Sequence, residues 1–117
     1  LAAAIAGLTD AQYHYALLLD TARGDAKDRH AAAIWYRRAA VNGHAPAQYR
    51  LGILHARGDS VERSLVETFA WWKIASVNGH IGARYELKKL ADHLTIKQVH
   101  EGRRLILERE ATAVGLR

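Results

Sequence analysis

The chain carries an internal repeat of 36 residues, and this repeat constrains its fold more than any other feature. When the sequence is shifted by 36 positions, AQY at 11–13 aligns with AQY at 47–49, and VNGH at 41–44 aligns with VNGH at 77–80. A fixed period of this size is typical of solenoids, in which each unit buries its apolar face only by stacking on the next. The sequence therefore predicts an array of stacked units rather than one closed core.

Capping signals and apolar spacing predict that each unit is a pair of helices. Thr9, Ser64 and Thr95 are each followed three residues later by Gln or Glu, the capping-box spelling of a helix start, and Asp28 is a further candidate N-cap. Single glycines at 43, 58 and 79 mark expected helix ends, and 23–25 is expected to separate the first two helices. The predicted helices span 9–21, 28–42, 46–57, 65–78, 81–93 and 95–110.

These elements predict an all-α fold, a right-handed α-solenoid of antiparallel helix pairs, in a single domain of residues 1–117. Its expected divisions are 1–8 as the end of a preceding repeat, 9–44 and 45–80 as full repeats, 81–110 as a partial repeat with a terminal capping helix, and 111–117 as a tail. Because 3–7 aligns with 39–43 and the chain has no methionine, we expect a fragment of a longer chain. A competing interpretation of the apolar start is the tail of a signal peptide, but no basic segment precedes it.

Composition excludes some classes of site and leaves others open. Without cysteine the chain can form neither disulfides nor thiolate metal sites. No apolar run approaches the roughly 18 residues that a membrane span needs. The formal net charge of +5 permits an acidic partner.

At the level of residues, the chain resembles the Sel1-like repeats, which are related to the tetratricopeptide repeat. The second repeat carries the residues of the family pattern at Ala47, Tyr49, Leu51, Gly52, Gly58, Val61, Trp71, Ala75 and Gly79. The period of 36 also fits this family better than the 34 of plain tetratricopeptide repeats. The resemblance implies a protein-interaction scaffold, commonly bacterial and sometimes exported, and not an enzyme. Cytoplasm and periplasm are both open as compartments.

Candidates for chemistry are few. The seven histidines form no pair at i, i+4 and no ligand set with neighbouring acids, so we expect neither a metal site nor a cofactor. His44 and His80 each follow a helix-ending glycine, where an imidazole can bond a final carbonyl or interact with the negative end of the helix. No nucleophile motif and no phosphate loop is present, and the capping role of Glu67 accounts for that acid. An enzyme is therefore not expected.

The tryptophans admit two interpretations. Trp35 and Trp71 occupy positions between helices in the family pattern, which favours the core over a stacking platform for single-stranded nucleic acid. Trp72 is less determined, because neighbouring residues point about 100° apart on a helix.

The first helix of each unit is expected to line an inner, concave face that binds a partner. Residues at i, i+4 and i+7 form a stripe along it, and cationic residues border the stripe. The stripe contains Tyr13, Leu17 and Asp20, followed by Tyr49, Ile53 and Ala56, and the bordering cations are Arg50, Arg57 and Lys89. The leading hypothesis is that this face binds a peptide or protein segment of unknown identity. For Tyr13 and Tyr49, packing between repeats is an equally supported alternative.

Two other functions remain open. A basic solenoid could bind nucleic acid, although the cations are spread over all repeats, and affinity would then fall steeply with salt. The second alternative is that the chain acts as a purely structural spacer in a larger protein. The terminal repeat faces could also mediate self-association, because an uncovered repeat exposes apolar surface.

Overall fold

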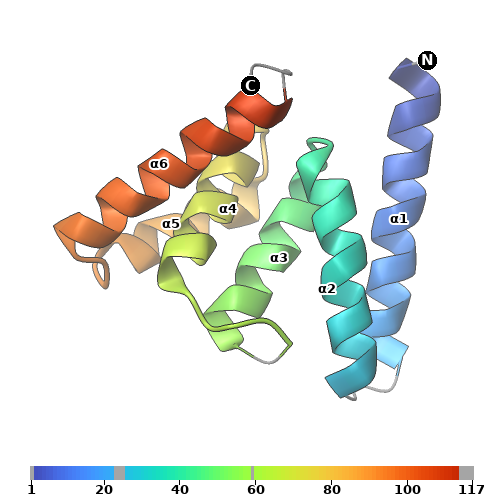
Figure 1. Cartoon of the computed structure of the whole chain (residues 1–117), viewed down its shortest axis with the longest axis horizontal. Helices are drawn as coiled ribbons and strands as arrows, with labels where there is room; N and C mark the ends of the chain where they lie inside the picture. Colours follow the sequence, from blue (N-terminus) through green and yellow to red (C-terminus); the bar gives the residue numbers. More distant parts are fainter. Residues whose placement is uncertain (1, 23–25, 59, 114–117) are drawn as a thin grey trace.

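The computed structural model describes residues 2–22, 26–58 and 60–113. Within these residues lie six helices that follow one another from α1 at one end of the array to α5 and α6 at the other (Figure 1). Their bounds are α1 Ala2–Ala22, α2 Ala26–Val41, α3 Ala45–Arg57, α4 Leu65–Val77, α5 Ile81–Ala91 and α6 Ile96–Ala113. Each helix packs on its neighbour in the chain, except that α6 packs back on α4. The fold is an all-α solenoid, as predicted.

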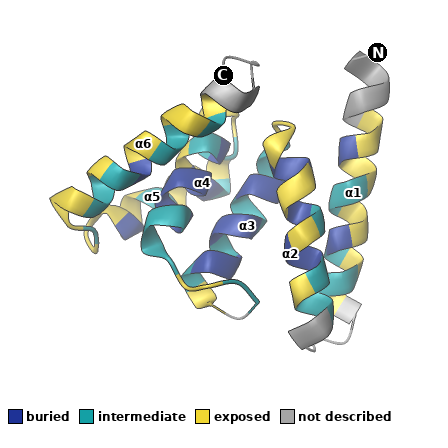
Figure 2. Ribbon diagram, in the orientation of Figure 1, coloured by how far each residue is buried: buried dark blue, intermediate teal, exposed yellow. Residues whose placement is uncertain are grey.

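Two apolar clusters fill the space between the helices, and α4 contributes to both. The first cluster joins α1, α2, α3 and α4; it includes Ala16, Ala32, Ala33, Tyr36, Ala39, Ala40, Ala47, Leu51, Leu54 and Trp71. The second joins α4 to α5; it includes Phe69, Trp72, Ala75, Ala83 and Leu90. Figure 2 shows the buried residues concentrated on the helices in the middle of the row. Because Trp71 and Trp72 point in different directions from α4, each enters a different cluster, and both are core residues.

The close approach of α3 and α4 depends on Gly52. A Cβ placed on Gly52 would lie 2.4 Å from the indole ring of Trp72, so only glycine leaves room for that ring. Trp72 also donates its Nε1 proton to the carbonyl oxygen of Tyr49, at 3.1 Å. One unit earlier, the corresponding residues are Ala16 and Tyr36 in the first cluster. The larger ring therefore accompanies glycine, and the smaller ring accompanies alanine.

The two repeated histidines begin helices instead of ending them, which corrects the expectation from sequence. His44 has extended backbone angles before α3, and its Nδ1 accepts a hydrogen bond from Ala47 N at 3.2 Å. His80 does the same before α5, accepting from Ala83 N at 2.9 Å. The imidazole thus satisfies one of the free N–H groups of a first helical turn. The preceding glycine already ends the earlier helix by adopting positive φ, +86° at Gly43.

The same cap explains a wrong prediction at the start of the chain. The expected N-cap Thr9 lies inside α1, which runs without a break from Ala2, and its side chain is buried. The position that corresponds to His44 and His80 is Leu8, whose side chain has no acceptor. Without a capping group there, nothing favours a turn, and the helix continues through Gly7.

The remaining helix starts are partly as predicted. Ser64 caps α4 by accepting from Glu67 N at 3.1 Å, and Thr95 forms a reciprocal capping box with Gln98 before α6. Asp28 lies in the first turn of α2 and is not its N-cap, because that helix begins at Ala26. The expected break at 23–25 lies outside the described residues.

Candidate interaction surfaces

The residues predicted to bind a partner lie on the first helices of the units, and we call this set of residues the first-helix face. It contains Tyr13, Leu17 and Asp20 on α1, Tyr49, Arg50, Ile53 and Arg57 on α3, and Lys89 on α5. Most of these side chains are half-buried, whereas Arg57 and Lys89 are exposed. The face therefore contributes to packing and stays partly exposed to solvent.

The tyrosines of this face pack between units. The Tyr13 ring lies 4.7 Å from the ring of His44, and the Tyr49 ring stacks on His80 at 4.5 Å. Each tyrosine thus contacts the histidine that caps the first helix of the next unit. This contact is the inter-repeat packing that the sequence left as an alternative, and it holds each ring in a fixed position.

Asp20 is also engaged within the fold. The hydroxyl of Tyr36 donates a hydrogen bond to Asp20 Oδ2 at 3.0 Å. Burial raises the pKa of Tyr36 well above its usual range, and the negative charge of Asp20 adds to this effect. Tyr36 therefore stays protonated and keeps Asp20 as its acceptor, so Asp20 supports the fold.

The cations of the face differ in their surroundings. Lys89 lies 3.8 Å from Glu86 and 5.0 Å from the centre of the Tyr85 ring. Within the described part of the chain, Arg50 and Arg57 form no ion pair. Burial lowers the pKa of His80, and the positive charge of Arg50 adds to this effect. Arg50 and Arg57 are thus the two cations of this face that have no acidic partner among the described residues.

A cleft of about 550 Å³ lies among α2, α4 and α6, and Gln48 of α3 also lines it. It is lined by Arg37, Ala40, Val41, Gly43, Gln48, Trp71, Ile74, Val77, Asn78, Leu105, Glu108, Arg109 and Glu110. None of the residues of the first-helix face takes part in it. Sequence reasoning missed this cleft because it depends on how α6 crosses the earlier helices.

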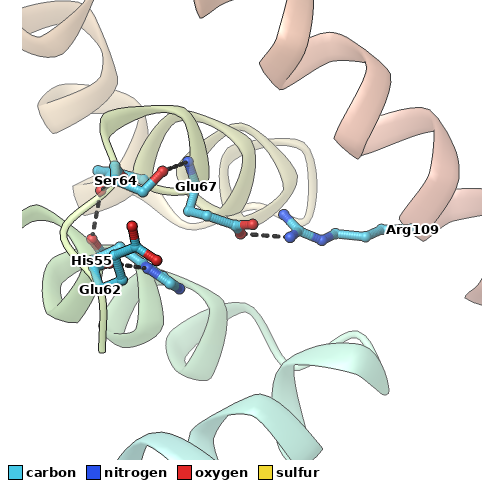
Figure 3. Close-up of polar contacts among 7 residues, drawn as sticks. His55, Glu62, Ser64, Glu67 and Arg109 are labelled. Atoms are coloured by element: carbon cyan, nitrogen blue, oxygen red, sulfur yellow. Dashed lines mark hydrogen bonds and ion pairs between the residues drawn. The ribbon is translucent and has the colours of Figure 1, made fainter. Parts of the chain in front are cut away.

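Arg109 fixes the position of α6 against α4. Its guanidinium forms an ion pair with Glu67 (Figure 3). The same guanidinium lies 4.3 Å above the Trp71 ring. The capping role expected for the Glu67 side chain is therefore wrong. The backbone N–H of Ser64, which that side chain was expected to bind, instead donates to the carbonyl of His55 at 2.9 Å. The repeat pattern carried no signal for this pair, since the counterpart of Glu67 one unit earlier is Ala31.

A third surface is the α1/α2 flank, which we define by Tyr15, Leu18 and Ile34. These side chains are exposed at the N-terminal end of the array, and Tyr15 meets Trp35 edge-on at 5.2 Å. Their counterparts 36 residues later are all buried: Leu51, Leu54 and Ala70. Trp35 is half-buried, whereas its counterpart Trp71 lies in the core. The flank therefore has the character of a repeat-stacking face.

The described residues present neither a metal cluster nor a membrane span. No three of their His, Asp or Glu side chains come close enough to hold a metal ion. No helix among them combines the length and apolar character needed to cross a bilayer.

Comparison with known proteins identifies the repeat. The model of the Sel1 repeat matches residues 9–44 and 45–80, more than half of the chain. A crystal structure of c5321, a protective antigen present in uropathogenic Escherichia coli strains and displaying an SLR fold, superposes with a TM-score of 0.79 at 32% sequence identity. The match covers 86% of this chain and 22% of that chain. No curated protein matches. The chain therefore belongs to the Sel1 repeat family, whose members are generally protein-interaction scaffolds.

Proposed function

We propose that this chain is an interaction module that binds a peptide or protein segment along the first-helix face. The observation that carries the proposal is the pair of cations on α3, Arg50 and Arg57, which form no ion pair with any residue that the structure describes and lie on the same helix as the half-exposed ring of Tyr49. A rigid aromatic side chain next to an arginine is a combination that is enriched in the parts of interfaces that contribute most to binding.

The arrangement favours a segment that carries carboxylates. An arginine fork can bind a carboxylate through two parallel N–H···O bonds, and the ring of Tyr49 offers apolar contact for the neighbouring part of the segment. Because His80 holds the Tyr49 ring in place, little side-chain freedom is lost when the ring meets a partner. A protein scaffold of the Sel1 family would use this face to select acidic segments.

The test is selection of peptides displayed on phage, followed by fluorescence anisotropy with a selected acidic peptide. Replacing Arg50 and Arg57 together by alanine should weaken binding by roughly 1–3 kcal/mol, the range of charge-assisted hydrogen bonds. A matched control replaces Lys73 and Arg103, two exposed cations of α4 and α6 that line neither the face nor the cleft. If the control loses affinity and the double variant keeps it, the partner binds the second helices and this assignment fails.

A salt titration separates the peptide from a nucleic acid. If the chain binds a single-stranded oligonucleotide, its cations release counterions from the phosphate backbone. The logarithm of the affinity should then fall steeply and linearly with the logarithm of the salt concentration. We expect a shallow dependence for the peptide, because only two cations contact it. Tight, steeply salt-dependent binding of the oligonucleotide in preference to every selected peptide would refute the proposal.

A further inference from the structure

One side of α1 carries apolar residues with the spacing of a helix–helix contact. We define the α1 seam by Leu8, Ala11, Tyr15 and Leu18, four exposed residues at steps of three, four and three. Steps of this kind keep residues on one side of a helix, as along the contact line of a coiled coil. Leu8, Tyr15 and Leu18 are 61%, 49% and 66% exposed, so the seam presents large apolar side chains to solvent.

The later units use the same positions for packing. The residues 36 positions after the last three of the seam are Ala47, Leu51 and Leu54, all buried in the first cluster. Another 36 positions on, Ala83 and Leu90 are buried in the second cluster. In both units the first helix packs on the second helix of the preceding unit. The α1 seam therefore has the character of a packing surface, although it is exposed.

The residues directly before the seam do not turn back to cover it. At the two later junctions the chain leaves the helical path at Gly43 and Gly79, whose φ angles are +86° and +93°, and the next helix then begins. In contrast, α1 continues from Ala2 through Gly7 without a break. Figure 1 shows α1 as the outermost helix at one end of the array. These residues therefore extend the helix and leave the seam uncovered.

The order of residues in the seam is complementary to itself. In two copies of α1 that run antiparallel, Leu8 of one copy meets Leu18 of the other, and Ala11 meets Tyr15, because each pair lies symmetrically about residue 13. Each ring then faces a small side chain, an alternation that fills the space between helices. A parallel pair would place ring against ring and alanine against alanine. The seam therefore has the self-complementarity that a two-fold interface requires.

The charges of α1 also allow a second copy to approach. This helix contains no lysine or arginine, and both of its acids contact groups within the fold. Asp10 lies 3.3 Å from His44, and Asp20 accepts a hydrogen bond from Tyr36. Two seams therefore meet without a pair of like-charged side chains between them.

The other exposed apolar residues of a first helix are less suitable. Ile81 and Tyr85 on α5 are 80% and 63% exposed. They share the exposed surface of α5 with three cations, Arg84, Lys88 and Lys89. Two copies that met through α5 would bring these like charges together, which opposes association.

From these observations we propose that the chain forms a two-fold symmetric dimer in which the α1 seams of two copies pack antiparallel. The first-helix face stays free in this dimer, because Tyr13 lies about 140–160° around α1 from every residue of the seam. One dimer would then offer two first-helix faces to a partner that carries two segments, with a gain in avidity. Dimerisation is measured without any peptide, so that this proposal and the proposed peptide site can fail separately.

The first experiment is sedimentation equilibrium of the whole chain at about pH 8, where histidine is uncharged. Four side chains per copy form a small interface, so we expect a weak dimer that populates between about 10 μM and about 1 mM. Ala11→Lys should raise the dissociation constant of the dimer at least about tenfold, because it places a charge against the ring of Tyr15 in the other copy. The matched control, Ala91→Lys, changes an exposed alanine of α5 and should leave the constant unchanged.

The second experiment tests the antiparallel direction by cross-linking, and it does not depend on the strength of the dimer. The chain has no cysteine, so that introduced thiols are the only ones present. Leu8→Cys labelled with nitrogen-15 is mixed with unlabelled Leu18→Cys, and disulfide-linked pairs are counted by mass spectrometry during mild oxidation. Mixed pairs should form faster than pairs of either variant with itself, because only facing residues come within disulfide distance. Thermal melts of all variants confirm that they are folded.

Each of three results would overturn the proposal. The first is a chain that stays monomeric up to about 1 mM, a concentration at which even weak specific dimers form. The second is a dimer whose dissociation constant is the same in Ala11→Lys as in the parent chain, since the copies would then meet through another surface. The third is cross-linking of each cysteine variant with itself as fast as with the other, because the seams would then not pack antiparallel.

Discussion

Replacing Gly52 by alanine tests the central contact of the second unit. The added Cβ would lie 2.4 Å from both Cδ1 and Nε1 of the Trp72 ring, far inside van der Waals distance. Either the buried ring moves, or α3 and α4 separate. The movement would also strain or break the hydrogen bond from Trp72 Nε1 to the carbonyl of Tyr49.

The magnitude follows from three contributions to the free energy of unfolding. Overpacking in a dense core typically costs about 1–3 kcal/mol. Leaving a buried N–H without its acceptor costs about 1–3 kcal/mol more when the bond is lost completely. The higher helix propensity of alanine opposes these losses by about 1 kcal/mol. We therefore expect Gly52→Ala to lower the free energy of unfolding by roughly 1–5 kcal/mol when the hydrogen bond is lost, the balance of these terms.

The chain offers a second substitution that should restore the stability lost in Gly52→Ala, and a control substitution at another helical glycine. The first unit combines Ala16 with Tyr36, so Trp72→Tyr in the Gly52→Ala background should recover about 1 kcal/mol or more as a coupling between contacting residues. Gly7→Ala adds a methyl to a helical glycine with open space around it and should stabilise α1 slightly.

Urea denaturation followed by circular dichroism measures five proteins: the parent chain, Gly52→Ala, Trp72→Tyr, the double variant and Gly7→Ala. A Gly52→Ala variant as stable as Gly7→Ala would mean that helix propensity outweighs the clash. The close approach of α3 and α4 described here would then be wrong. A double variant that is less stable than either single variant would likewise refute the pairing of ring size with glycine.

Three further predictions concern the core, the caps and the flank. Trp71→Ala should lower the free energy of unfolding by about 3–5 kcal/mol in one cooperative transition, and a melt within a degree or two of the parent would contradict the burial of this ring. The His80 cap accepts a hydrogen bond only when the imidazole is neutral, and burial lowers its pKa below the ordinary 6.5. The unfolded chain therefore binds more protons, and the free energy of unfolding should fall as the pH drops below about 6.5. For His80→Asn, the free energy of unfolding measured by denaturation should fall less between pH 7.5 and pH 5.5 than it does for the parent chain. An equal fall in both proteins would show that the His80 cap does not cause the pH dependence. Leu18→Asp with Ile34→Asp should reduce self-association through the α1/α2 flank; equal monomer fractions in sedimentation would count against that interface.

The sequence by itself determined the architecture of this protein. The period, the apolar spacing and the capping residues act within one helix or between neighbouring units, so their consequences can be predicted from residue positions alone. Ser64 and Thr95 cap helices as predicted, because each hydrogen bond closes within three residues. Trp71 is buried as predicted, because the repeat assigns its position to the space between helices.

Short sequence motifs gave wrong predictions at Thr9 and at the two repeated histidines. The residues that begin at Thr9 match the capping-box motif. The first helices α3 and α5, however, are capped by the imidazoles of His44 and His80. The corresponding residue before Thr9 is Leu8, which has no imidazole. Each histidine could in principle have bonded the end of one helix or the start of the next. The three-dimensional path of the turn decided this, because it brings Nδ1 within reach of the third N–H of the next helix.

Only the tertiary structure decided the cleft and the position of the last helix. Arg109 meets Glu67 across 42 residues, and no periodic pattern encodes that pair, because α6 occurs once. Its crossing over α4 places a guanidinium on Trp71 and leaves two buried N–H groups facing no described acceptor. A contact between distant helices depends on their relative angle and distance, which result from the packing of the whole array rather than from any short stretch of residues.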